Sequence, residues 1–88
     1  MAKSDAELHH ECLNRFIELA NSMKDEGVNS SVVSAALMTS SAVYATYVAA
    51  GNEGTLAASG VAKVAEAYRE HLARVQDMRQ AEIDARKS

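Results

Sequence analysis

The fold is decided by residues 30–50, which read SSVVSAALMTSSAVYATYVAA. This segment contains no charged residue, and it lies between Gly27 and Gly51. Its length and its alanine content predict one helix of about six turns. A soluble helix usually keeps one polar side toward water, but this one is apolar or weakly polar on every side. The sequence therefore predicts a helix that is covered by protein all round.

Apolar residues follow two seams on opposite sides of this helix, each with heptad-like spacing. The seam of large side chains consists of Val33, Leu37, Ser40, Tyr44 and Tyr47. The opposite seam, which we call the alanine seam, consists of Ser31, Ala35, Met38, Ala42, Ala45 and Ala49. Small side chains let two helix backbones approach closely, so we predict that the alanine seam is the interface between two copies. The alternative is that it receives another helix of the same chain.

Amphipathic segments flank the central helix on both sides, and we predict helices at about residues 5–26 and 60–84. The first is expected to start after a capping box formed by Ser4 and Glu7 and to end before Gly27, a left-handed cap. Asn29 or Ser30 can cap the central helix, and the third helix is expected to begin after Ser59. Apolar residues recur at helical spacing along one side of both flanking helices.

These segments predict an all-α protein of one domain, residues 1–88, in an antiparallel three-helix up-down-up arrangement. Two amphipathic partners cover about two thirds of the circumference of a helix, so a helix that is uncharged all round needs a third partner. The simplest third partner is a second copy of the chain. We therefore predict that homodimerisation completes a larger helical bundle. A chain of 88 residues with one Phe would also gain stability from that additional burial.

Composition excludes several classes of partner. The net charge of −3 comes from interspersed acidic and basic residues, so no basic stripe for nucleic acid is present. Cys12 is the single cysteine, which is typical of a reducing compartment, and the charged N-terminal segment is unlike a signal peptide. The uncharged stretch is long enough to cross a membrane, but its serine, threonine and alanine content disfavours insertion. We expect a cytoplasmic protein without nucleic-acid or membrane partners.

Residues that could carry chemistry are sparse. No catalytic residues and no cofactor are predicted, because the serines lack a His-Asp arrangement and the glycines form no phosphate-binding loop. Glu7 and His10 have the spacing of a di-iron motif, yet both project on the polar side of their helix. His9 and Cys12 could supply half of a metal site that a second copy or His71 completes, although a structural role is the expected one. We predict that the protein is no enzyme and holds no metal.

Polar-tipped aromatic residues mark the place where a ligand would bind. Tyr44 and Tyr47 lie near the end of the central helix, and Asn52 follows in the loop. A tyrosine can place its ring in an apolar wall and its hydroxyl toward a ligand, although core packing is its more common role. If a small-molecule site exists, we expect it to be lined by Tyr44, Tyr47 and Asn52.

Several segments together resemble a known family. They are residues 34–38 (SAALM), 41–47 (SAVYATY), 50–54 (AGNEG) and 59–64 (SGVAKV), with 16–21 (FIELAN) and the pair Tyr68-Arg69. This pattern is similar to a family of small proteobacterial all-helical proteins that is classed as a domain of unknown function. The resemblance implies a bacterial cytosolic protein, and it carries over no catalytic residue.

The resulting prediction is an uncharacterised, non-enzymatic, homo-oligomeric protein that acts through protein–protein contacts, as a homodimer and with a possible further protein partner. The alternative is a small-molecule or metal-binding module whose site lies at the dimer interface.

Overall fold

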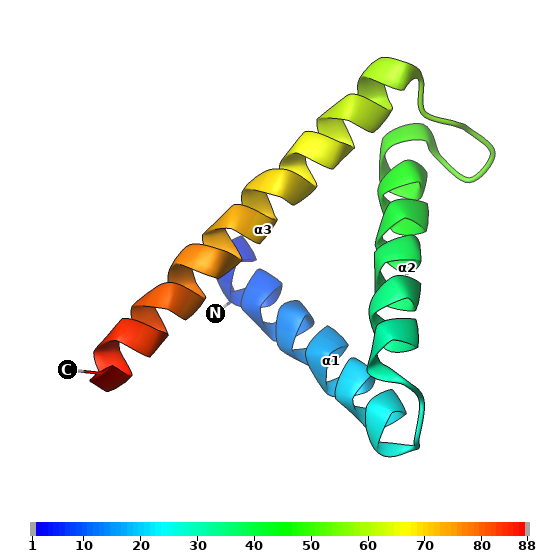
Figure 1. Ribbon diagram of the computed structural model, residues 1–88. Helices are drawn as coiled ribbons and strands as arrows, with labels where there is room; N and C mark the ends of the chain where they lie inside the picture. The colour runs from blue at the N-terminus through cyan, green and yellow to red at the C-terminus, as the bar shows by residue number, and fades with distance from the viewer. Residues whose placement is uncertain (1, 88) are drawn as a thin grey trace. The chain divides into compact units, whose positions relative to one another are not determined.

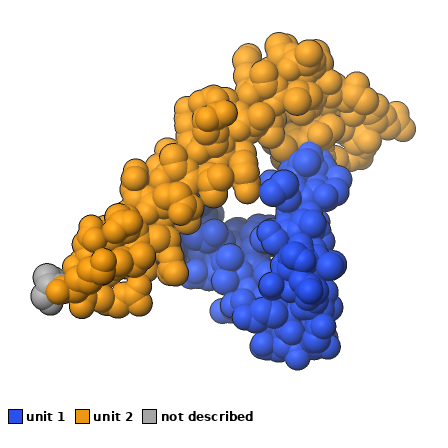
Figure 2. Space-filling model, viewed as in Figure 1, with its two compact units in different colours: residues 1–44 blue, residues 45–88 orange. Residues whose placement is uncertain are grey.

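The chain is all-helical, as predicted. A computed structural model describes residues 2–87, which form α1 (Asp5–Asp25), α2 (Ser30–Ala50) and α3 (Ala58–Lys87) in that order (Figure 1). Residues 2–87 contain no strand. The chain divides into two compact units, Met1–Tyr44 and Ala45–Ser88, which Figure 2 colours separately. Unit 1 therefore holds α1 and most of α2, whereas unit 2 holds the last turns of α2, the loop and α3.

Both ends of α1 are closed as its sequence predicts. Ser4 Oγ accepts a hydrogen bond from the Glu7 backbone N–H at 3.2 Å, and Glu7 Oε1 accepts one from the Ser4 N–H at 3.1 Å. At the other end Gly27 has a φ of 102°. The Gly27 N–H donates to the Lys24 carbonyl at 2.9 Å and the Val28 N–H donates to the Met23 carbonyl at 3.1 Å. This pair of bonds is the Schellman motif, which satisfies carbonyls that the helix end leaves open.

The cap of α2 is Asn29, one of the two residues proposed for it. Asn29 Oδ1 accepts hydrogen bonds from the Ser31 N–H at 2.9 Å and from the Ser31 hydroxyl at 2.7 Å. The helix then continues without interruption to Ala50. Gly51 ends it with a φ of 80°, and its N–H donates to the Tyr47 carbonyl at 2.9 Å.

The bounds of α3 differ from the prediction at both ends. The helix begins at Ala58, two residues before the predicted start, so Ser59 lies inside the first turn and does not precede it. The earlier start brings Gly60 against Leu56, whose Cβ would lie 3.4 Å from a Cβ added at Gly60. At its other end the helix continues to Lys87. Arg86 and Lys87 stabilise this last turn because cations favour the carbonyl end of a helix.

Within unit 1, α1 and α2 lie closest to each other near the turn that joins them and diverge away from it (Figure 1). Val33, in the first turn of α2, is 8% exposed and is the single buried residue among those that the structure describes. Ala20 and Met23, near the end of α1, are half-buried. Leu8 and Leu13, farther from the turn, are exposed. The packing of this helix pair is therefore concentrated at the turn.

Within unit 2, the half-buried residues gather where α2 ends and α3 begins. They are Ala45, Thr46, Ala50, Leu56, Gly60 and Val64, and Ile83 is half-buried near the other end of α3. Gly54 lies so close to α2 that an added Cβ would be 2.1 Å from the Ala50 carbonyl oxygen. Glycine is therefore required at this point of the loop, because any side chain would clash with backbone.

Candidate functional site

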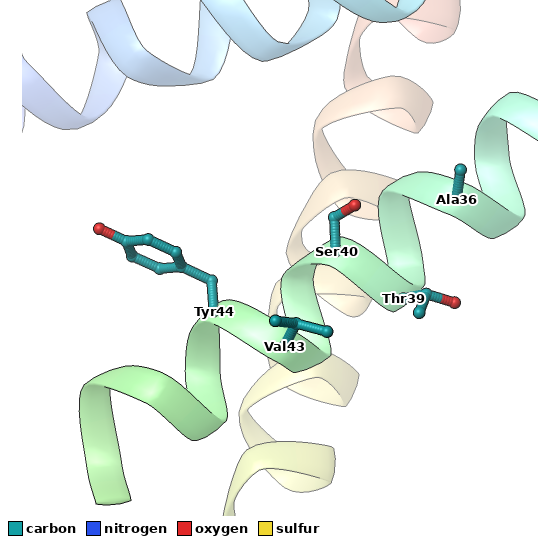
Figure 3. A pocket seen from close by; sticks show the side chains of 5 residues that line it. All are labelled: Ala36, Thr39, Ser40, Val43 and Tyr44. Atoms are coloured by element: carbon teal, nitrogen blue, oxygen red, sulfur yellow. The ribbon is translucent and has the colours of Figure 1, made fainter. Parts of the chain in front are cut away.

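A shallow hollow of about 530 Å³ lies on α2 within unit 1. Figure 3 shows that Ala36, Ser40 and Tyr44 project along one side of the helix, with Thr39 and Val43 beside them. The lining is mostly apolar and carries three hydroxyl groups. Its volume is within the range of small-molecule sites, but it is open to solvent. The hollow can offer an apolar wall and hydrogen-bonding hydroxyl groups. Its five lining residues include no charged side chain and no nucleophile that is paired with a base.

A second concave surface, which we call the α1/α2 groove, lies between the two helices of unit 1. It has a volume of about 160 Å³ and an apolar lining. Its residues are Phe16, Leu19, Ala20 and Met23 of α1 with Val33, Ala36, Leu37 and Ser40 of α2. The groove runs along the part of unit 1 where the helices are closest. Its shape and lining therefore suit a row of apolar side chains from a third helix.

The three residues proposed for a ligand are divided between the units. Tyr44 lines the hollow, whereas Tyr47 and Asn52 belong to unit 2 and do not line it. Sequence reasoning did not assign the other lining residues to a site. Their spacing of three and four residues, from Ala36 through Thr39 and Ser40 to Val43, could have placed them on the side of Tyr44. A site that combines Tyr44, Tyr47 and Asn52 remains a prediction.

The seam of large side chains is the side of α2 that faces α1. Val33, Leu37 and Ser40 all line the α1/α2 groove. Because the alanine seam is on the opposite side of the same helix, α1 does not cover it. Ala35, Met38, Ala42 and Ala49 are exposed, and Ala45 is half-buried in unit 2. Among the helices of the same chain that could cover this seam, α1 is therefore excluded.

Residues with metal-binding chemistry are dispersed. His9 and Cys12 are both exposed on α1. Between residues 2 and 87, no three or more His, Cys, Asp or Glu side chains are grouped as metal ligands would be. His71 Nδ1 lies 3.1 Å from an Arg74 guanidinium nitrogen. Since a guanidinium has only donors, this imidazole nitrogen acts as the acceptor.

Several charged side chains cap a helix or pair with one another on the surface. The hydrogen bond from the Ser4 backbone N–H, followed by the one with the Ser4 side chain, lowers the pKa of Glu7 below its ordinary value of 4.5. Exposed ion pairs join Lys3 with Glu11, Glu66 with Arg69, and Glu82 with Arg79. Such exposed pairs contribute little to stability. These contacts therefore lie on a solvated surface.

By length and composition, α2 could cross a membrane, and it is the one described helix that could. The core helix of a soluble protein passes the same test.

Comparisons with other proteins place the chain in a family. No curated protein matches the chain, and no solved structure does. Residues 9–84 match a family whose description is protein of unknown function (DUF3144). The match covers most of α1, all of α2 and nearly all of α3. The chain is therefore a member of this family of proteins of unknown function, DUF3144.

Proposed function

We propose that the protein is a non-enzymatic homo-oligomer, a homodimer in its simplest form, that acts through protein–protein contacts. In this proposal the three helices run up, down and up, and a second copy completes the bundle. A bacterial origin and a cytoplasmic location belong to the same proposal. They are supported by the sequence resemblance and by Cys12, an unpaired cysteine that suits a reducing compartment.

The observation that carries the proposal is the surface of α2. From Gly27 to Asn52 the chain has no charged residue, yet Val33 is the single buried residue within 2–87. Val32, Met38, Val43 and Val48 lie on different sides of this helix and are all exposed. Exposed apolar surface of this extent marks protein–protein contact in soluble proteins. A second copy of the chain is a partner that is present wherever the protein is made.

The alanine seam is the proposed centre of the interface. With α1 on the opposite side of α2, the seam is open to α3 or to a second copy. A two-fold axis against the seam would join identical small-residue surfaces, which is the self-complementary contact that a symmetric dimer requires. The small side chains would let the paired helices approach to about 8 Å, the short end of the range for helix pairs.

Light scattering after size exclusion, at two protein concentrations, tests this proposal. We expect the mass of a dimer for the wild type and the mass of a monomer for Ala35→Glu, because a carboxylate in a close helix contact is costly. The control is Ala73→Glu, which adds the same charge to an exposed position on the polar side of α3 and should leave the dimer intact. A wild type that remains monomeric at both concentrations would refute the proposal.

The hollow on α2 supports a second candidate, a small-molecule site that includes Tyr44. Its apolar wall with Thr39 and Ser40 hydroxyls suits an aromatic ligand that carries a hydroxyl or carboxyl group. A thermal-shift screen of aromatic acids and alcohols tests it, and binding would raise the melting temperature with ligand concentration. Thr39→Val keeps the shape of the side chain and removes its hydroxyl, so it should reduce that rise. No shift with any compound of this class would exclude the candidate.

A further inference from the structure

We draw no further inference here: the strongest candidate, the apolar α1/α2 groove of unit 1 together with the uncharged surface of α2 beside it, carries none, because nothing in the structure shows what covers it.

Discussion

Ser4 and Glu7 cap each other's backbone at the start of α1. The Glu7 N–H donates to Ser4 Oγ at 3.2 Å, and the Ser4 N–H donates to Glu7 Oε1 at 3.1 Å. We expect Ser4→Ala to lower the free energy of unfolding by about 1 kcal/mol, because a helix N–H loses its acceptor. Urea denaturation followed by circular dichroism measures this loss. Ser4→Asp supplies another acceptor and should retain most of the stability.

The same contact predicts a pH dependence. The pKa of Glu7 is lowered below 4.5 in the folded protein by its hydrogen bonds with Ser4. Its contribution is therefore fully present above pH 4.5 and is lost as the pH falls through the lowered pKa. Between neutral pH and pH 3, Glu7→Gln should show a smaller decrease in melting temperature than the wild type. An equal decrease in both proteins would show that Glu7 has no part in the acid response.

Two glycines of unit 2 should respond to alanine with opposite signs. At Gly54 an added Cβ would lie 2.1 Å from the Ala50 carbonyl oxygen, so Gly54→Ala should destabilise the protein by about 2 kcal/mol. Gly60 lies inside α3, and its added Cβ would make an ordinary 3.4 Å contact with Leu56. Gly60→Ala should therefore stabilise the protein by about 0.5–1 kcal/mol through helix propensity. Thermal denaturation of the two variants side by side tests both signs.

Gly27 tests the left-handed end of α1. Its φ of 102° disfavours any residue with a Cβ, although no atom lies within 4 Å of the position that a Cβ would take. The strain is conformational and not a clash, so Gly27→Ala should cost about 1–2 kcal/mol. Gly27→Asn should cost less, since asparagine visits this conformation more readily. Equal losses for Ala and Asn would indicate a different cause.

Alanine variants of two valines on α2 distinguish packing within unit 1 from packing against another chain. Val33 is buried, so Val33→Ala should cost about 2 kcal/mol at any protein concentration. Val43 is 65% exposed, and Val43→Ala should change the stability of an isolated chain by less than about 0.5 kcal/mol. A larger loss at Val43 that grows with protein concentration would place this residue in a subunit contact. Denaturation at two concentrations provides the comparison.

The features that could be predicted from the sequence are those that depend on residues close together along the chain. The capping box at Ser4 and the cap at Gly27 are set by residues within one turn, and the structure has both. The start of α3 was misplaced because Ser59 looks like a cap, whereas the helix begins at Ala58 and the Val61 N–H donates to the Ala57 carbonyl at 3.0 Å.

The candidate sites depend on contacts between helices, which periodicity does not determine. Helical spacing showed that α2 has two opposite seams, but it could not show which of them faces α1. The groove lining of Val33, Leu37 and Ser40 answers that question. The hollow beside Tyr44 likewise combines Ser40 and Tyr44, from the seam of large side chains, with Ala36, Thr39 and Val43, which belong to neither seam.

The uncharged surface of α2 has a consequence for how its contacts respond to conditions. With no Asp, Glu, Lys, Arg or His between Gly27 and Asn52, contacts between two such segments have no ion pairs for salt to screen. Their strength comes from apolar burial, which weakens on cooling and increases with sulfate or phosphate. An assembly held through α2 should therefore loosen in the cold and tighten in kosmotropic salts, while moderate sodium chloride leaves it nearly unchanged.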